Sequence, residues 1–421
     1  MIGHTNIFRA EPGKHLKVAY RTAAFLCLLL PTMFAFGQDH WVTTWAAAMM
    51  QQTPLSAGTT LGVSNQTVRN VVHLSIGGKV LRIRFANTYG SAPLVIGEAH
   101  VALRRESGTI EPGTDHVLTF GGSKSIQIPV GAPILSDPIS MDTPADSDLA
   151  VSVFVPGSVP TPTIHELARQ TTYVSGTGNF TGSAEIPKFT TQQSWYFLQS
   201  VEVLAPKRTS VIVAFGDSIT DGAASTIDAN RRWPNFLESR LRSIGGKTAP
   251  AVIDEGIAGN RLLHDGWGPN ALARFDRDVL AHSGVSSVVI LEGINDLGFP
   301  RWTATPMYAQ EEVSVENIIT AYKQLIARAH ARGIPVYIGT MTPFEGSFYF
   351  SADEQTKRQA LNDWIRSSGS ADGTIDFDAA VRDPSHPSRL LPLYDSGDHL
   401  HLNDAGYERM ANAIDLRFFK H

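Results

Sequence analysis

From Val211 onward, short apolar runs alternate with helix-like segments, and this alternation is the strongest constraint on the fold. The apolar runs are VIVAF (211–215), AVIDE (251–255), SVVILEG (287–293) and VYIGT (336–340). The segments that alternate with them are WPNFLESRLRSI, ALARFDRDVLA, VENIITAYKQLIARAHARG and DEQTKRQALNDWIRSS. Nearly continuous apolar strands separated by helices indicate a parallel sheet that is covered on both faces. We therefore predict an α/β domain over residues 206–421.

The preceding part of the chain has a different period. The runs VVHLSI, VLRIRFAN, SIQIPV and LAVSVFVP alternate apolar and polar residues, as half-buried strands do. Gly77-Gly78, between the first two runs, is a hairpin signal. We predict an all-β sandwich or jelly-roll module over residues 38–205, joined to the α/β domain by VLAPKRTS (203–210).

The N-terminus resembles an export signal. Lys14, Lys17 and Arg21 precede an uncharged, Leu-rich stretch that ends at small residues, Ala35 and Gly37. A membrane anchor is the alternative, but this stretch is shorter than the roughly 20 apolar residues that cross a bilayer. We predict a signal peptide over residues 1–37 and a secreted or periplasmic mature protein.

Composition excludes several kinds of site and partner. The only cysteine, Cys27, lies in the predicted signal, so the mature chain would have no disulfide, thiol nucleophile or cysteine-based metal site. Removing residues 1–37 takes away four basic residues and one acidic residue, which changes the net charge from −5 to −8. A nucleic-acid partner is therefore not expected. We see no second apolar run long enough to span a membrane, and the sequence does not determine the oligomeric state.

Four polar clusters follow the predicted strands or precede the last helix. They are GDSITDG (216–222), GIAGN (256–260), GIND (293–296) and DHLH (398–401). Each cluster alone also fits an ordinary turn or helix cap. Ligands of parallel sheets bind beyond the carboxyl ends of the strands, however, so these residues are the first candidates for a site.

Taken together, the clusters supply the groups that acyl transfer requires. Ser218 provides a hydroxyl nucleophile, His401 a base, and Asp398 a carboxylate that holds the imidazole in the required tautomer. The oxyanion would be bound by the backbone N–H groups of Ser218 and Gly259 and by the side-chain amide of Asn295. Gly259 suits this role because no side chain blocks the approach to its N–H.

The order of Ser218, Gly259, Asn295 and His401 along the chain resembles the four blocks of the SGNH (GDSL) hydrolase superfamily, and DHLH fits its Asp-x-x-His pattern. The Gly-x-Ser-x-Gly motif of α/β-hydrolases is absent around Ser218. The resemblance implies a flavodoxin-like three-layer α/β/α fold and ester hydrolysis without a metal or other cofactor. It extends, less specifically, to secreted two-domain members with an N-terminal β-module, some of them similar to xylan and other carbohydrate esterases.

Other polar residues near the motifs have alternative interpretations. His399 and His264 are rival bases, but the Asp-x-x-His spacing favours His401. Asp217 and Asp221, with Asp296, are candidate cation ligands that structural turn roles explain better.

We expect Asp296 to brace the loop that carries Asn295 and not to take part in the chemistry. Trp267, Trp302 and Tyr394 lie near the motif loops, where they either line a sugar or acyl pocket or belong to the core.

The sequence thus predicts a secreted serine esterase that removes short acyl groups, with acetyl expected, from a carbohydrate. One alternative is a general short-chain aryl or lipid esterase. Another, of a different class, is a non-catalytic carbohydrate-binding protein, which the complete set of four groups argues against. None of these groups precedes residue 206, so we expect the β-module to contribute substrate reach and not chemistry.

Overall fold

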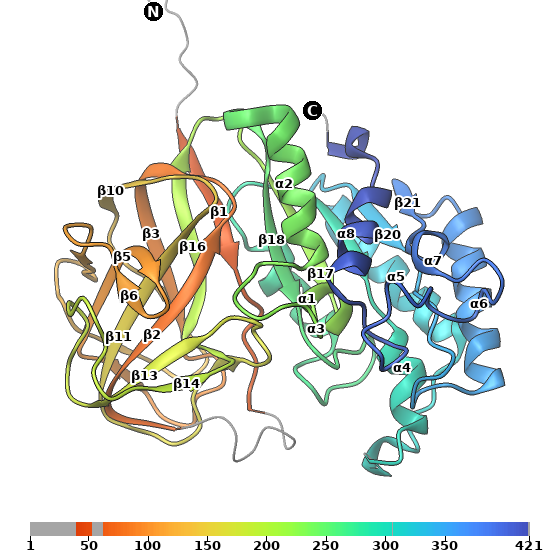
Figure 1. Ribbon diagram of the computed structural model, residues 1–421, viewed down its shortest axis with the longest axis horizontal. Coiled ribbons are helices and arrows are strands. Elements are labelled where there is room, and N and C mark those ends of the chain that lie inside the picture. The colour runs from red at the N-terminus through yellow and green to blue at the C-terminus, as the bar shows by residue number, and fades with distance from the viewer. Residues whose placement is uncertain (1–38, 53–61, 305, 420–421) are drawn as a thin grey trace, which may run out of the picture. The chain divides into compact units, whose positions relative to one another are not determined.

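The computed structural model describes residues 39–52, 62–304 and 306–419. Residues 1–37, the predicted signal peptide, lie outside this range. An all-β region that ends at Ala205 is followed by an α/β region that begins at Val211 (Figure 1). None of the helices in the described ranges combines the length and apolarity that a membrane crossing requires.

The all-β region contains two large antiparallel sheets and two small strand pairs. The first sheet has the order β1-β16-β3-β10, with β9 also paired to β3; the second has the order β14-β13-β2-β11-β5-β6, with β7 also paired to β5. The small pairs are β12 with β15 and β4 with β8. Their bounds are β1 (His40–Ala46), β2 (Val63–Leu74), β3 (Gly78–Ala86), β4 (Leu94–Ile96), β5 (Glu98–Glu106), β6 (Thr109–Ile110), β7 (His116–Val117), β8 (Ile126–Ile128), β9 (Pro133–Leu135), β10 (Ile139–Thr143), β11 (Ser147–Val159), β12 (Ile164–His165), β13 (Thr172–Thr177), β14 (Thr190–Gln192), β15 (Trp195–Tyr196) and β16 (Leu198–Ala205).

Alternating side chains from both large sheets share one hydrophobic core. Leu81 and Ile83 of β3 pack in the same buried cluster as Val151 and Val153 of β11. The period-two pattern therefore placed apolar side chains correctly between two sheets.

The hairpin predicted at Gly77-Gly78 is wrong, because β2 pairs with β11 and β13 whereas β3 pairs with β16, β10 and β9. The chain crosses between sheets at this turn. A Cβ on Gly77 would lie 2.2 Å from the backbone oxygen of Thr143, so the glycine permits close passage past β10 rather than a two-residue hairpin.

The α/β region is built on a five-stranded parallel sheet with the order β18-β17-β19-β20-β21. Its strands are β17 (Val211–Gly216), β18 (Ala251–Gly256), β19 (Val285–Leu291), β20 (Val336–Gly339) and β21 (Gly373–Ile375). The chain reverses its direction of sheet growth at β17, which has β18 on one side and β19 on the other. Ligand sites in open parallel sheets form at such a switch point, beyond the carboxyl ends of the strands.

Helices follow most of these strands, and four of them lie close to the four predicted helical segments. They are α1 (Ser218–Asp221), α2 (Trp233–Gly245), α3 (Ala271–Phe275), α4 (Ile294–Gly298), α5 (Val315–His330), α6 (Ala352–Ser367), α7 (Phe377–Val381) and α8 (Asp404–Ala413). The segment after α3 continues as a π-helical turn, Asp276–Leu280. Asn403 caps α8, since its side chain accepts a hydrogen bond from Gly406 N at 3.0 Å.

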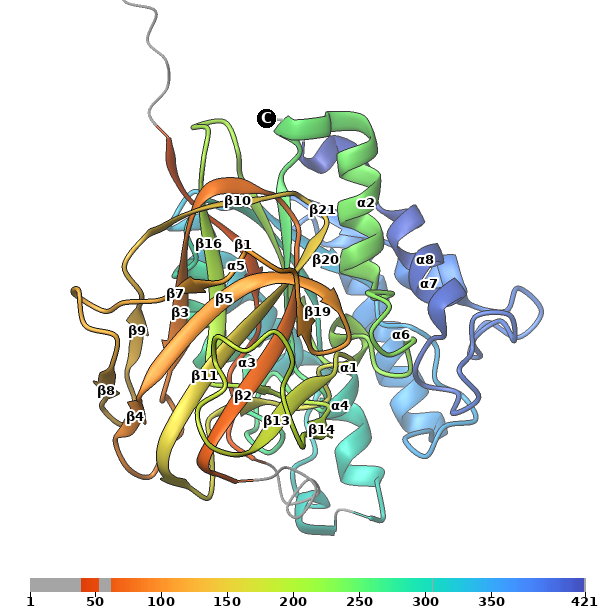
Figure 2. The ribbon, with the colours of Figure 1, turned by 60° about the vertical axis from the view of Figure 1, so that its left-hand side comes forward.

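The β-region and the α/β region pack directly against each other within one compact unit. Val42 and Ala46 of β1 belong to the hydrophobic core around the parallel sheet. Hydrogen bonds reinforce this packing: Thr43 N donates to Ser283 O at 3.0 Å, and Val252 N donates to the Ser75 side-chain Oγ at 2.9 Å. Figure 1 shows the β-region beside β18 and α2, and Figure 2, turned so that the β-region comes forward, shows its strands in front of the parallel sheet.

Candidate active site

Ser218 lies at the turn between β17 and α1. The side chain of Asp217 caps the helix by accepting a hydrogen bond from Ile219 N at 2.9 Å, and Gly222, with φ of 84°, ends it after a single turn. Ser218 thereby stands at the carboxyl end of a central strand, with 5% of its surface exposed. We call residues 216–222 the nucleophile turn.

Ser218, His401 and Asp398 form a continuous hydrogen-bonded chain. Ser218 Oγ lies 2.9 Å from His401 Nε2, and His401 Nδ1 lies 2.6 Å from Asp398 Oδ2. Because an ionised carboxylate only accepts hydrogen bonds, Nδ1 carries the imidazole proton. The lone pair of Nε2 is then free to accept the Ser218 hydroxyl proton, which is the arrangement of a nucleophile with its general base.

The second oxygen of Asp398 is fixed by the loop itself. Asp398 Oδ1 accepts hydrogen bonds from His401 N at 2.8 Å, Leu400 N at 2.9 Å and Ser396 Oγ at 3.0 Å. Burial acts to raise the pKa of Asp398, but hydrogen bonding and charge interaction with His401, together with the backbone N–H groups, hold this pKa well below its ordinary range. Asp398 therefore stays ionised across the neutral range.

The rival histidines are not placed to serve Ser218. His399 has a left-handed backbone, with φ of 63°, and its Nδ1 lies 2.5 Å from Asp395 Oδ2. His264 follows the second motif cluster, and no hydrogen bond within the described residues joins it to Ser218. Of the three candidates, the structure brings His401 to the serine.

The GIAGN segment, residues 256–260, which we call the oxyanion loop, lies against the nucleophile turn. Ile257 N donates to Gly216 O at 2.9 Å, which joins the ends of β18 and β17. Gly259 adopts φ of 77°, and a Cβ there would lie 2.7 Å from the ring of Trp267. Both the left-handed backbone and the adjacent indole require glycine at this position.

Asn295 is held next to the oxyanion loop by two hydrogen bonds. Its Nδ2 donates to Asn260 O at 2.8 Å, and its Oδ1 accepts from the Tyr349 hydroxyl at 2.9 Å. These partners fix which end of the amide carries the N–H groups, because a carbonyl oxygen can only accept. One N–H of the amide remains for a ligand. Tyr349 was not predicted from the sequence; it lies in the loop after β20, outside the motif clusters.

A buried arginine, also not predicted, fastens the strand ends under the site. Arg274 Nη2 donates to Gly216 O at 2.8 Å, and Arg274 Nη1 donates to Glu255 O at 2.7 Å. Its Nε donates to Asn260 Oδ1 at 2.8 Å, and Glu292 lies 3.3 Å from the guanidinium. One side chain thus connects the ends of β17 and β18 with the oxyanion loop and the segment after β19.

The carboxylates near the motifs bind protein groups. Asp296 accepts hydrogen bonds from Leu262 N at 2.7 Å and Leu263 N at 3.1 Å, so it braces the segment after the oxyanion loop. Asp221 Oδ2 accepts from Ala258 N at 3.2 Å, and its Oδ1 lies 3.1 Å from His165 Nε2. Asp296 and Asp221 therefore have structural roles, as the sequence suggested. Asp221 has in addition a partner in the β-region, His165.

Residues 214–409 match the profile of the GDSL-like Lipase/Acylhydrolase family. They form a GDSL hydrolase domain. The match includes all four motif clusters, and the resemblance to GDSL hydrolases noted from the sequence is confirmed. The protein is accordingly a carboxylic ester hydrolase. No curated protein sequence matches the chain.

Solved structures resemble about half of the chain. A GDSL-like lipase from Bacteroides thetaiotaomicron is 21% identical, with a TM-score of 0.37, and the match covers 48% of this chain and 85% of that one. An acetylxylan esterase from Geobacillus stearothermophilus is 20% identical, with a TM-score of 0.38, over 49% of this chain and 93% of that one. The aryl esterase of M. smegmatis is 18% identical, with a TM-score of 0.38, over 49% and 96%.

Aromatic side chains cluster beside Gly259 and Asn295 in the GDSL domain. The ring of Trp267 lies 6.1 Å from that of Trp302, which in turn lies 5.0 Å from Phe348. Phe348 is 47% exposed, so the cluster reaches the surface. Trp267 and Trp302 thus lie together, whereas Tyr394 lies in the segment before DHLH, where its backbone oxygen accepts from Asn403 N at 3.0 Å.

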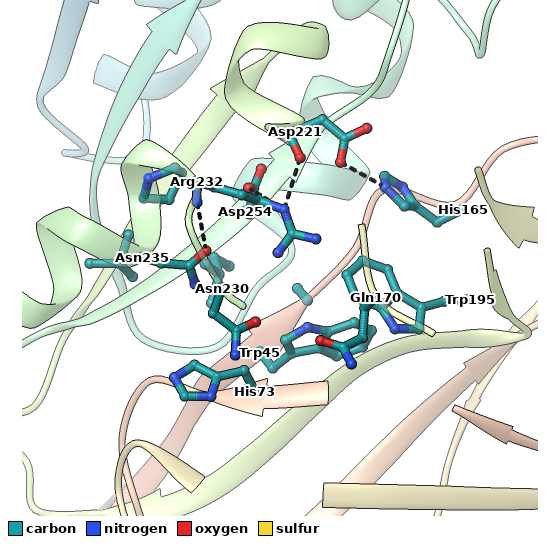
Figure 3. A pocket seen from close by; sticks show the side chains of 14 residues that line it. Trp45, His73, His165, Gln170, Trp195, Asp221, Asn230, Arg232, Asn235 and Asp254 are labelled. Carbon is teal, nitrogen blue, oxygen red and sulfur yellow. Dashed lines mark hydrogen bonds and ion pairs between the residues drawn. The ribbon is translucent and has the colours of Figure 1, made fainter. Parts of the chain in front are cut away.

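A small cavity of about 30 Å³ lies between the nucleophile turn of the GDSL domain and the β-region (Figure 3). Asp254, at the end of β18, is part of its lining. Asp254 Oδ1 accepts from Gly256 N at 2.9 Å, while Oδ2 is buried without a hydrogen-bond partner among the described residues; the nearest cation, Arg232, is 4.0 Å away. Burial raises the pKa of Asp254 from 3.8 to about 7.

Asp254→Asn is expected to reduce the pH dependence of stability. In the wild type the native state holds a proton on Asp254 that the unfolded chain releases, so the free energy of unfolding falls as pH rises from about 4 to about 7. Asparagine still accepts the Gly256 hydrogen bond and cannot ionise. Melting temperatures between about pH 5 and pH 8 should therefore fall less steeply in the variant than in the wild type; equal slopes would show that Asp254 ionises normally.

Proposed function

We propose that the protein hydrolyses short-chain acyl esters through an acyl-enzyme on Ser218, and that its substrate is an acetyl ester of a carbohydrate. The observation that carries the reaction is the chain from Ser218 Oγ through His401 to Asp398, with contacts of 2.9 and 2.6 Å. These are direct hydrogen-bond distances, so the proton of the nucleophile has a base within reach.

Each residue then has a defined part in the reaction. Ser218 Oγ attacks the ester carbonyl carbon while His401 Nε2 takes the hydroxyl proton. The tetrahedral oxyanion is stabilised by the N–H groups of Ser218 and Gly259 and by the Asn295 amide. His401 gives its proton to the departing alkoxide oxygen, which leaves the acyl group on Ser218. A water molecule, deprotonated by His401, attacks that acyl group and releases the carboxylic acid and the free serine.

Three features support the narrower substrate. Bulky aromatic rings pack closely beside Gly259 and Asn295, which favours a small acyl group over a long chain. The partly exposed ring of Phe348 offers an apolar face of the kind on which sugars pack. The signal-like N-terminus suits a substrate outside the cytoplasm, and we propose secretion or periplasmic export for this reason. We also propose that the hydrolase domain has the flavodoxin-like three-layer α/β/α arrangement.

Acetate release from acetylated polysaccharides, measured beside hydrolysis of aryl esters of increasing acyl length, tests this function. We expect kcat/KM to be highest for acetyl and to fall with each added methylene, with acetate released from at least one polysaccharide. Activity restricted to aryl acetates would instead identify a general esterase, and a preference for long chains a lipid esterase. A folded wild-type protein that releases no acetate from any of these esters would contradict the proposed substrate.

Asn295→Asp is expected to reduce kcat more than it changes KM. The amide N–H is proposed to face the oxyanion of the transition state and not the ground-state carbonyl, so its loss should cost on the order of 10²–10³ in kcat. Aspartate adds a negative charge where negative charge develops and should be at least as harmful as Asn295→Ala. Steady-state kinetics and melting temperatures of both variants provide the measurement. Near-normal kcat in folded Asn295→Asp would contradict the oxyanion role and leave Asn295 as a turn residue.

A further inference from the structure

His165 is a fully buried histidine that the β-region places against the nucleophile turn. It belongs to the short strand β12, and 2% of its surface is exposed. Its Nδ1 lies 2.9 Å from the backbone oxygen of Ala48, and its Nε2 lies 3.1 Å from Asp221 Oδ1. Figure 3 shows the imidazole pointing at the Asp221 carboxylate, which projects from the end of α1. The contact joins residues 56 positions apart in the chain.

The two partners of His165 determine how its protons are placed. A carbonyl oxygen only accepts hydrogen bonds, so Nδ1 donates to Ala48. The contact between Nε2 and Asp221 then needs a second proton, which is present when the imidazole is charged. Burial acts to lower the pKa of His165, but the charge of Asp221 and the hydrogen bond to it outweigh burial and raise this pKa. The pair is thus a buried imidazolium–carboxylate contact.

Asp221 in turn connects the nucleophile turn with the oxyanion loop and the start of α2. It is the last residue of α1, whose first residue is Ser218. Its Oδ2 accepts from Ala258 N at 3.2 Å, and Ala258 immediately precedes Gly259 in the oxyanion loop. Its backbone oxygen accepts from Arg232 Nε at 2.8 Å. The Asp221 carboxylate is therefore fixed on one oxygen by the β-region and on the other by the peptide next to the proposed oxyanion donor.

We propose that His165 is a positioning residue of the esterase site: by holding Asp221, it fixes the oxyanion loop relative to the nucleophile turn. The inference rests on the proposed function, in which Gly259 donates to the oxyanion. It extends the role of the β-region from substrate reach to the geometry of catalysis, because the region supplies one end of a hydrogen-bond chain that ends at Ala258.

Two substitutions at position 165 separate the two hydrogen bonds of the imidazole. His165→Asn can keep the donor to Ala48, because the asparagine amide nitrogen lies near the position of Nδ1, but it loses the contact with Asp221. His165→Gln reaches Asp221 and loses Ala48. We expect His165→Asn to lower kcat for a small aryl acetate roughly 10- to 100-fold with KM little changed, since small misplacements of catalytic groups have effects of this size. His165→Gln should retain more of the wild-type kcat.

Asp221→Ala provides a second test that does not alter the β-region. Alanine has no carboxylate, so both the contact with His165 and the hydrogen bond from Ala258 N are lost. We expect a loss of kcat comparable with that of His165→Asn. The matched control is His73→Asn, which replaces a histidine of the β-region that contacts Asp148 at 2.8 Å and Asp146 at 3.2 Å, with no hydrogen bond in the described residues to the nucleophile turn or the oxyanion loop. It should lower the melting temperature and leave kcat unchanged.

The outcomes distinguish this inference from the proposed function. Wild-type kcat in folded His165→Asn or Asp221→Ala would overturn the positioning role while leaving an inactive Ser218→Ala variant, and with it the proposed function, intact. Equal losses in His165→Asn, His165→Gln and His73→Asn would also overturn it, because a general loss of stability would then explain the effect. An active Ser218→Ala variant would overturn the proposed function itself.

Discussion

Ser218→Ala should abolish esterase activity while leaving the protein folded, with a loss in kcat on the order of 10⁵–10⁶. Removing the hydroxyl leaves no atom that can carry the acyl group, and the remaining oxyanion donors assist only the direct attack of water. Ser218 is 5% exposed, and its Oγ lies 2.9 Å from His401 Nε2. The substitution therefore removes one polar atom and little packing. Hydrolysis of an aryl acetate by purified wild type and variant provides the measurement.

A serine-directed phosphonate identifies the nucleophile independently of turnover. It should label wild-type protein at Ser218, as read by peptide mass, and should not label Ser218→Ala. The matched control is Ser225→Ala, which changes another buried serine. Ser225 lies in the loop after α1, and its Oγ has no hydrogen-bond partner among the described residues. Label on a different residue, or full activity in Ser218→Ala, would contradict the acyl-enzyme mechanism.

The hydrolase half of the fold was predictable because its signals are local and strong. Strands buried on both faces of a parallel sheet are continuous apolar runs, so β17, β18, β19 and β20 were located within about two residues. The strand β21 was missed, since its three residues, Gly-Thr-Ile, are too few to show a period. The motif clusters were found for a related reason: the carboxyl ends of adjacent parallel strands meet at one edge, so polar residues there must be neighbours.

Strand pairing in the β-region was not predictable in the same way. Period two shows which face of a strand is buried but not which strand lies beside it. Gly77-Gly78 illustrates the limit, because a glycine pair marks a turn whether the chain returns within one sheet or crosses to another. The crossing is decided by close passage against Thr143, a residue far away in the sequence.

Residues that support the site were missed because their partners are remote. Tyr349 reaches Asn295 across 54 positions, and His165 reaches Asp221 across 56. Neither lies in a motif, and a lone tyrosine or histidine is usually an ordinary core or surface residue. The motif residues were recognisable by their chemistry, whereas the side chains that orient them became recognisable only from the folded contacts.

Asp398→Asn should lower kcat on the order of 10⁴-fold with little effect on folding. The carboxylate accepts from His401 Nδ1 at 2.6 Å, which leaves Nε2 as the acceptor that faces Ser218. An asparagine can present its N–H₂ group to the imidazole instead, and Nδ1 then becomes the acceptor while Nε2 carries the proton. In that tautomer His401 cannot accept the serine proton. The variant also lacks the negative charge that stabilises the imidazolium formed during the attack.

The pH dependence of Asp398→Asn separates the tautomer effect from a loss of ionisation. Because the pKa of Asp398 is held well below its ordinary range, lowering the pH of the wild type from about 8 to about 5 leaves this carboxylate charged, and any acid decline in kcat/KM belongs to another group. The variant should therefore remain impaired throughout this range. Asp395→Asn is the matched control, since Asp395 holds His399 by the same kind of contact at 2.5 Å. Comparable kcat in Asp398→Asn and wild type, with Asp395→Asn impaired, would mean that His399 and not His401 is the base.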